Sequence, residues 1–412
     1  MDNFLIFSSL IVFTFCGYMV WPSRLNVVSH LTAGGSFISI FVPSIVVDVS
    51  RFYPKPVVDL YVNVLVVGML SFLPLFILGF RAGRGYYTRF SFELMNEEQY
   101  EQRAIKITKY LMIGGVAGLI ISYIGMGFIP VFAQDPISAK LFRGAYQEPY
   151  RRVAILFRSS FFILATIMPI ACIIWYKYRY TFFLYLTVIA FSLMIMSLVR
   201  SSAFGGVALA VTIVMATKSR RHFALLMIGI VGMFICSAFF YHIVGARTLS
   251  GKEDFWQVVA ASSPDIDDQL QFLVKFRDHP VYTYGKTIYG GLIPGHYKWN
   301  PSVYTLNVTA PTEDINNVSS GGIRLPLPLW GYVSFQWVGV VLFSGITAFL
   351  SGFSLRILKN WFEKFPSLLT RTICVVIFGT LFGFLVGFTS LNMYNIPPLL
   401  ISLLYIYRFK WN

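Results

Sequence analysis

Two arginines are unusual because they stand inside or between long apolar runs. Arg158 lies about one and a half turns into the run 153–176, and Arg200 stands between two further apolar runs. A guanidinium in hydrocarbon costs at least ~2.5 kcal/mol, so each should face a partner or an aqueous cavity. Its planar fork of donors suits phosphate oxygens, which predicts a site for a phosphate-bearing ligand. The alternative is a structural arginine that binds backbone carbonyls or reaches the membrane surface.

A second set of reactive side chains lies in one long polar stretch, residues 245–325. Its histidines and carboxylates are candidates for a general base, and no spacing selects one of them. Its tyrosines and tryptophans could stack on sugar rings, or belong to the aromatic belt of a membrane interface. Basic side chains extend the arginine set in a way that suits an anionic lipid head group; they are Arg143, Arg151, Arg152, Arg247, Arg277, Lys298 and Arg324.

The chain that must position these residues is mostly hydrophobic. Of its 412 residues 56% are hydrophobic and 12% are charged, whereas a soluble domain has roughly 25% charged residues. Uniformly apolar runs near the length of a bilayer-spanning helix predict an all-α, polytopic integral membrane protein rather than a barrel. We expect about eleven spans, at residues 4–21, 25–47, 57–80, 110–132, 153–176, 181–199, 203–217, 223–244, 329–353, 372–388 and 396–407.

These spans predict three parts, which are transmembrane helices one to eight in 1–244, a large loop in 245–325, and helices nine to eleven in 326–412. Lys and Arg concentrate in the turns on one side, and the positive-inside rule assigns that side to the cytoplasm. The N-terminus and the large loop then face the periplasm of a bacterial inner membrane, and the C-terminus faces the cytoplasm. The net charge of +15 is thereby assigned to topology, and no nucleic-acid partner is expected.

No sequence signature for a metal, nucleotide or redox cofactor is present in the chain. CxxC, HExxH, P-loop and GxGxxG patterns are all missing, so we expect no metal site and no cofactor. The four cysteines all fall within apolar runs, which predicts no disulfide; they are Cys16, Cys172, Cys236 and Cys374.

Two short helices are predicted outside the spans. Asp135-Pro136 is an N-cap and first-turn pair that should open a helix through Phe142. Ser263-Pro264, followed by Asp265, Asp267 and Asp268, should open a second helix, and its apolar stripe predicts that it lies on the outer membrane face. The prolines and glycines of 279–325 predict an irregular but ordered loop.

Within and after the polar stretch, glycine, proline and aromatic residues recur in short runs. One group is His279-Pro280, then Tyr289-Gly290-Gly291-Leu292-Ile293-Pro294, then Lys298-Trp299-Asn300-Pro301. The other leads into the next apolar run and is Gly321-Gly322, Leu329-Trp330-Gly331-Tyr332 and Gln336-Trp337-Val338-Gly339-Val340. With one large loop placed late among the spans, these runs resemble the O-antigen polymerases (Wzy-type), also called oligosaccharide repeat-unit polymerases. The chain departs from that family at Gly295, where the family has an arginine, and at Lys298, which precedes Trp299 instead of following it.

The resemblance implies a GT-C-like fold with an outward cavity, and a metal-independent glycosyltransferase that joins undecaprenyl-pyrophosphate-linked glycans. Donor and acceptor would both be lipid-linked, and membrane lipids and a chain-length regulator protein would be further partners. It also implies the site. The pyrophosphate would be bound by Arg158, Arg200, Arg277 and Arg324, the proton taken by His296 or Asp278, and the glycan bound by Tyr289, Tyr297 and Trp299.

Two other functions fit the same composition. An O-antigen ligase would use the same pyrophosphate chemistry but transfer the glycan to lipid A core. A flippase or other transporter of lipid-linked oligosaccharide would explain the intramembrane arginines as part of a substrate path. The product of the reaction distinguishes a ligase from a polymerase. A polymerase needs an ordered loop and a transporter does not, which distinguishes those two.

Overall fold

The structure is a computed structural model of the chain. It describes residues 2–36, 41, 44–45, 52–87, 92–93, 97–219, 221–222, 224–226, 228–229, 232, 265–293, 295–312, 322–389, 391–406 and 410–411.

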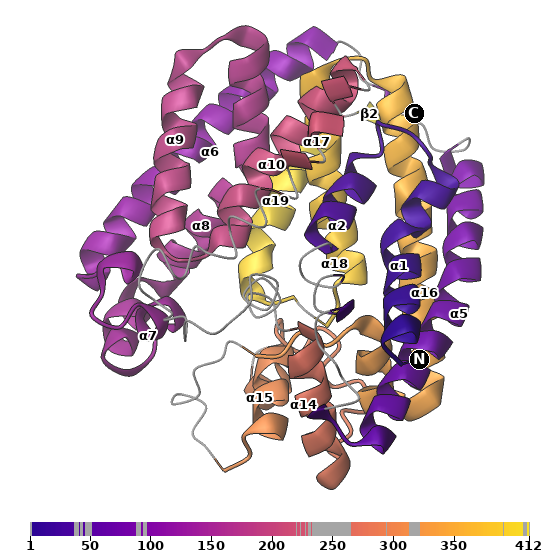
Figure 1. Ribbon diagram of the computed structural model, residues 1–412. Helices are drawn as coiled ribbons and strands as arrows, with labels where there is room; N and C mark the ends of the chain where they lie inside the picture. Colours follow the sequence, from indigo (N-terminus) through magenta and orange to yellow (C-terminus); the bar gives the residue numbers. More distant parts are fainter. Residues whose placement is uncertain are drawn as a thin grey trace. The chain divides into compact units, whose positions relative to one another are not determined.

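Helices make up nearly all of the described secondary structure (Figure 1). In chain order they are α1 (Asp2–Val20), α2 (Val27–Ser36), α5 (Lys55–Tyr87), α6 (Glu97–Met126), α7 (Pro136–Leu141), α8 (Gln147–Tyr178), α9 (Thr181–Met196), α10 (Arg200–Lys218), α14 (Asp265–Asp278), α15 (Pro301–Thr309), α16 (Leu327–Lys364), α17 (Leu368–Ile377), α18 (Gly383–Val386) and α19 (Ile396–Ile406). Short 3-10 turns are η2 (Pro130–Phe132), η3 (Gly144–Tyr146), η4 (Tyr297–Trp299) and η6 (Met393–Asn395), and η5 (Phe378–Phe382) is a π-helical turn. The strands β1 (Phe92–Glu93) and β2 (Lys410–Trp411) pair antiparallel.

The apolar helices indicate a membrane-embedded protein, and the mostly helical described residues are consistent with an all-α fold. Within the described ranges, six helices are long and apolar enough to cross a bilayer. Three of the other predicted spans correspond to shorter apolar helices, Thr181–Met196, Ser202–Lys218 and Met393–Ile406. Most of the predicted span 223–244 lies outside the described residues. The six long helices are Asp2–Val20, Lys55–Arg84, Glu97–Phe132, Gly144–Tyr178, Leu327–Lys364 and Leu368–Val386.

Contacts divide the chain into two compact units, each assembled from separate stretches of sequence. Unit 1 comprises Met1–Gly83, Met227–Arg356 and Val386–Asn392. Unit 2 comprises Arg84–Leu226, Ile357–Leu385 and Met393–Asn412.

In unit 1, α5 and α16 approach each other closely at two glycines. A Cβ on Gly79 would lie 2.0 Å from the carbonyl oxygen of Phe349, and one on Gly352 would lie 2.0 Å from that of Phe76. Hydrocarbon provides no hydrophobic force between helices, so their association depends on such close backbone packing. Both positions therefore require glycine.

Leucine in place of Gly79 should prevent α5 from packing on α16, because its side chain would overlap the backbone of α16 at Phe349. We expect most of the variant to aggregate on detergent extraction, measured as the monodisperse fraction in size-exclusion chromatography. Gly114→Leu is the matched control, since a Cβ there meets no atom within 4 Å. Equal monodisperse fractions for the two variants would contradict this packing.

The helix α14 confirms the predicted acidic start but not the predicted location of its apolar face. Its first turn carries Asp265, Asp267 and Asp268 and its last turn Lys275 and Arg277, as helix polarity favours. The apolar face is buried within the core of unit 1, with Leu270 and Leu273 both at 0% exposure. The expectation that this face rests on the membrane is therefore wrong. An amphipathic pattern specifies an apolar partner and does not distinguish lipid from protein.

Two tyrosines of unit 1 bind α14 by hydrogen bonds. Tyr61, on α5, donates to the side-chain oxygen of Gln269 at 2.6 Å, and the Gln269 amide donates to the Arg324 carbonyl at 2.8 Å. Tyr53 donates to the Asp267 carboxylate. Burial raises the pKa of Tyr53, and the bond to Asp267 raises it further, so this hydroxyl is a donor at neutral pH.

Tyr61→Phe should destabilise unit 1 by about 1–3 kcal/mol, because it leaves the buried Gln269 oxygen without its donor. The measurement is the thermal unfolding midpoint in detergent. Tyr53→Phe should lower the midpoint less, because the Asp267 carboxylate that loses its donor is only partly buried and can bind water. An unchanged midpoint for Tyr61→Phe would show that this hydrogen bond does not stabilise the helix.

In unit 2, α8 packs against α6, α9, α10, α17 and α19. A polar cluster joins three of these segments at Glu101, whose side chain is 5% exposed. Lys177 contacts Glu101 at 2.6 Å and donates to the Ser367 hydroxyl at 2.9 Å, and Tyr178 and Ser367 both donate to Glu101. The carboxylate of α6 is thereby bonded to the end of α8 and the start of α17.

Candidate functional site

The predicted site residues fall in both compact units, so each group is considered within its own unit. Unit 2 contains Arg158 and Arg200, and the other predicted residues lie in unit 1. Arg200 is the first residue of α10, and its side chain lies outside the described part of the chain.

A short helix and a tight turn build the surroundings of Arg158. As predicted, Asp135 caps α7, and its carboxylate accepts from the backbone N–H groups of Ile137 and Ser138. The helix ends at Phe142 in the left-handed conformation, with a φ of 54°. The ring of Phe142 then stacks on Tyr150 at 3.8 Å between centroids.

Three aromatic rings surround the guanidinium of Arg158. Its Cζ lies 5.2 Å from the ring centre of Phe142, and 5.6 Å from those of Tyr150 and Tyr394. Its Nε donates to the Tyr150 hydroxyl at 2.8 Å. Cation–π attraction is worth about 0.5–2 kcal/mol or more when desolvated, so these rings offset much of the cost of a half-buried charge. They thus account for how a structural arginine is tolerated here.

The remaining donors of Arg158 are available to a ligand. A guanidinium has five N–H groups, and Arg158 makes one hydrogen bond to the described residues, through Nε. It forms no ion pair within the described ranges. The rings therefore orient the guanidinium while its terminal nitrogens keep the fork that suits phosphate.

Two further arginines lie on the first turns of α8. Arg151 pairs with Glu148 at 2.9 Å, but both side chains are mostly exposed, so this pair adds little stability. A groove of about 410 Å³ runs beside Arg151 and Arg152 along α8, with Ile155 and Leu156 in its wall. Arg158 is not among its lining residues.

In unit 1 the polar stretch is folded onto the first turns of α16 and onto residues 386–392. Thr283 donates from its backbone to the Val333 carbonyl at 2.9 Å, and its hydroxyl lies 2.8 Å from that of Ser334. Tyr289 donates from its backbone to Phe388 at 2.7 Å. The expected irregular loop is thus ordered by specific bonds. The prediction missed α15, whose N-cap Asn300 bonds the backbone of Ser302.

Trp299 is the centre of a group of charged and aromatic side chains in this stretch. The ammonium of Lys286 lies 4.9 Å from its ring centre and that of Lys298 lies 5.2 Å away. Tyr304 stacks on Trp299 at 6.4 Å and donates its hydroxyl to the Val281 carbonyl at 2.7 Å. Burial raises the pKa of Tyr304, so its hydroxyl remains protonated and keeps this bond.

A close backbone approach fixes the position of Trp299. A Cβ on Gly290 would lie 2.2 Å from the Trp299 carbonyl oxygen, so only glycine fits there. The preceding residue, Tyr289, has a φ of 51°, which is uncommon outside glycine and indicates local strain. His296 joins the same group, because its carbonyl accepts from the Trp299 backbone at 2.9 Å. Tyr289, His296 and Trp299, predicted separately, are therefore close along adjoining turns.

The other predicted residues of unit 1 are at the surface. Arg277 and Asp278 are exposed at the end of α14, and Arg324 is exposed where its carbonyl bonds Gln269. Tyr297 lies in η4, and its side chain is outside the description. Arg277, Lys286, Lys298 and Arg324 form no ion pair with any residue that the structure describes.

Sequence reasoning missed Lys286 and the rings around Arg158. Lys286 reaches Trp299 across 13 positions of chain, and Tyr394 reaches Arg158 from the far end of the sequence. The spacing of residues along the sequence predicts neither contact. In the described ranges, no three His, Cys, Asp or Glu side chains converge as metal ligands.

Comparisons with protein-family models, curated proteins and solved structures found no match to this chain. The site must therefore be interpreted from its own geometry.

Proposed function

We propose that this chain is a metal-independent glycosyltransferase of a bacterial inner membrane. It would join undecaprenyl-pyrophosphate-linked oligosaccharide repeat units into O-antigen or a related surface polysaccharide at the periplasmic face. The observation that carries the proposal is the group around Trp299, where two ammonium groups flank one aromatic ring on an ordered, polar segment. An anionic, sugar-bearing ligand matches both features, since cations attract phosphate and the ring offers an apolar face.

Two exposed arginines of unit 1 support the same ligand class. Arg277 and Arg324 form no ion pair with any residue that the structure describes, and three of the four acidic residues of α14 lie in its first turn, away from Arg277. Cations without acidic partners retain their full attraction for an incoming anion. The assignment of Arg158 and Arg200, which lie in unit 2, to the pyrophosphate stays a prediction from the sequence.

The proposed reaction needs a base and charge stabilisation. A sugar hydroxyl of the acceptor attacks the anomeric carbon of the donor, and its oxygen forms the new glycosidic bond. The bond from that carbon to the pyrophosphate oxygen breaks, and undecaprenyl pyrophosphate leaves with the electron pair. His296 or Asp278 takes the hydroxyl proton. Arginine and lysine side chains stabilise the negative charge that grows on the leaving group.

The test uses purified protein in detergent with a defined lipid-linked repeat unit. Lys286→Gln combined with Lys298→Gln should slow chain extension by roughly tenfold or more, read as loss of the long products on a gel. Lys275→Gln, an exposed lysine on α14, is the control for loss of charge alone. Extension at the same rate in all three proteins would remove the support that the group around Trp299 gives to the proposal.

A transporter of lipid-linked oligosaccharide is the second candidate, because α16 is interrupted and α17 runs on into a π-helical turn. The backbone of α16 leaves the helical range at Phe335 and Gln336, and α17 continues into the π-helical turn η5. Broken helices of this kind line substrate paths in transporters, and π-turns are frequent at functional sites.

The glycan products of cells that lack the protein separate the candidates, ligase included. Loss of polymerase activity leaves lipid A core bearing one repeat unit. Loss of a flippase or a ligase leaves core alone. We expect core plus one repeat, and core alone would overturn the polymerase proposal.

A further inference from the structure

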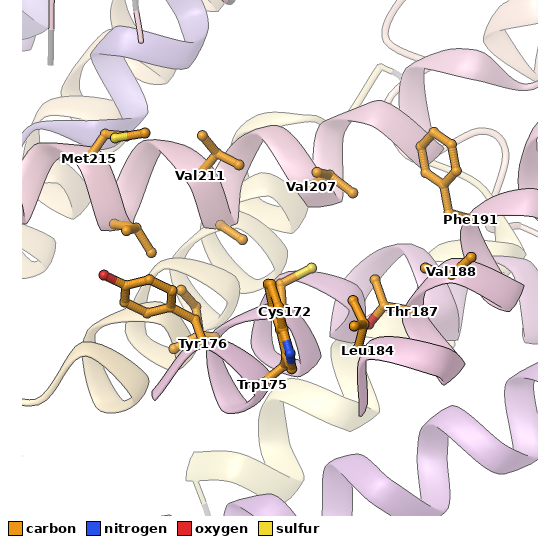
Figure 2. Close-up of a pocket in the computed structure, with 13 residues that line it drawn as sticks. Cys172, Trp175, Tyr176, Leu184, Thr187, Val188, Phe191, Val207, Val211 and Met215 are labelled. Atoms are coloured by element: carbon orange, nitrogen blue, oxygen red, sulfur yellow. The ribbon is translucent and has the colours of Figure 1, made fainter. Parts of the chain in front are cut away.

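An apolar groove is lined by residues of α8, α9 and α10 in unit 2 (Figure 2). Its lining residues on α8 lie between Cys172 and Tyr176. Its volume is about 400 Å³. Tyr176 of α8, Val188 of α9, and Val211 and Met215 of α10 are among its lining residues (Figure 2). Water does not fill a cavity of this character, because it would find almost no hydrogen-bond partners. In a membrane-embedded protein, hydrocarbon chains are the available occupant.

Two cations mark one end of the groove. The guanidinium of Arg179 lies 5.6 Å from the ring centre of Tyr176, and the ammonium of Lys218 lies 5.5 Å from the same ring. Arg179 ends α8 in the left-handed conformation, with a φ of 58°, and Lys218 is the last residue of α10. Two separate helices thus bring positive charge to one aromatic side chain that lines the groove.

The neighbouring Lys177, in contrast to Arg179 and Lys218, has an acidic partner. The ammonium of Lys177 is 2.6 Å from the buried carboxylate of Glu101 and also bonds Ser367. Arg179 and Lys218 are exposed and form no ion pair within the described ranges. Basic residues at helix C-termini are common. That tendency does not explain why Arg179 and Lys218, from two different helices, both contact the ring of Tyr176, which lines the groove.

We propose that this groove holds one acyl chain of an anionic diacyl phospholipid, whose phosphate contacts Arg179 and Lys218. The geometry satisfies both parts of such a lipid, since the chain displaces empty apolar volume and the phosphate neutralises two otherwise unpaired cations. This lipid is a bound structural ligand and not the glycan substrate. The inference is independent of the proposed function.

The test measures lipid binding to delipidated, full-length protein by native mass spectrometry. Phosphatidylglycerol and phosphatidylcholine with identical acyl chains are titrated separately. Each positive charge near an anionic head group contributes roughly fivefold in affinity. The double variant Arg179→Gln/Lys218→Gln should therefore bind phosphatidylglycerol roughly 25-fold more weakly. The wild-type protein should prefer phosphatidylglycerol over phosphatidylcholine, and the double variant should lose that preference.

Two further variants locate the lipid. Val211→Phe places a ring in the groove and should weaken binding of both lipids, because the acyl chain loses its volume. Arg103→Gln/Lys106→Gln removes two exposed charges from α6 and should leave binding unchanged.

Equal affinity of the wild-type protein for the two lipids would overturn the proposal. Unchanged phosphatidylglycerol binding in Arg179→Gln/Lys218→Gln would overturn it as well. Should Val211→Phe fail to fold, the charge variants, which alter only exposed side chains, still decide the outcome.

Discussion

Alanine in place of Arg158 should reduce the rate of chain extension by about 100-fold or more. Removing one preorganised donor to a developing negative charge typically costs this much, and the aromatic rings around Arg158 hold its guanidinium ready to act. The measurement is the single-turnover rate of purified protein with a defined lipid-linked repeat unit. Arg158→Lys should recover part of the rate, because it restores the charge but not the fork.

The alternative for Arg158 is a structural role, and the same variants test it. A structural arginine would lower the unfolding midpoint when replaced and leave the rate per folded molecule unchanged. Tyr150→Phe provides a matched comparison, since it removes the acceptor of the Nε hydrogen bond but keeps the guanidinium. Arg103→Ala removes an exposed arginine from α6 and should change neither quantity. A full rate in Arg158→Ala would end its assignment to the pyrophosphate.

Glu101→Ala should destabilise unit 2 by up to about 3 kcal/mol, the lower end of the range for breaking a buried ion pair, because the Glu101 side chain is 5% exposed whereas that of Lys177 is 33% exposed. The substitution leaves the Lys177 ammonium, the Tyr178 hydroxyl and the Ser367 hydroxyl without their shared acceptor. The thermal unfolding midpoint in detergent should fall steeply. The loss should be seen at neutral pH, where the carboxylate of the wild-type protein is charged.

A double variant tests whether the loss of stability comes from the Lys177 charge that Glu101→Ala leaves unpaired. Glu101→Leu combined with Lys177→Met removes both charges and keeps most of the side-chain volume, so much of the stability should return. Lys359 and Glu363 form a looser, partly exposed pair at 3.7 Å. Glu363→Ala is therefore the control, with an expected loss within about 1 kcal/mol. Similar losses for Glu101→Ala and Glu363→Ala would show that burial of the first pair has no energetic consequence.

Local signals predicted the structure well where one turn of chain was enough to determine it. Asp135 and Pro136 predicted α7 through capping and the fixed φ of proline, and Asp265 predicted the start of α14 through its charge. Long apolar runs predicted the membrane helices for a similar reason, since hydrocarbon requires a backbone that satisfies itself.

Features that depend on contacts between distant parts of the chain could not be predicted from the sequence. The apolar stripe of α14 indicated burial but did not reveal that protein, and not lipid, covers Leu270. The interruption of α16 at Gln336, where φ is 52°, involves no proline that would predict it. The ring of Tyr394 reaches Arg158 from a remote part of the chain. These contacts are set by tertiary packing, which a local pattern does not encode.

Reconstitution with a single defined substrate tests the proposed polymerase activity. Purified protein receives undecaprenyl-pyrophosphate-linked repeat units, without nucleotide sugars or other enzymes, and the products are separated by size. A polymerase should yield a ladder of lipid-linked polymers together with released undecaprenyl pyrophosphate. Unchanged repeat units, combined with their movement across the bilayer of vesicles that contain the protein, would contradict this activity and identify a transporter.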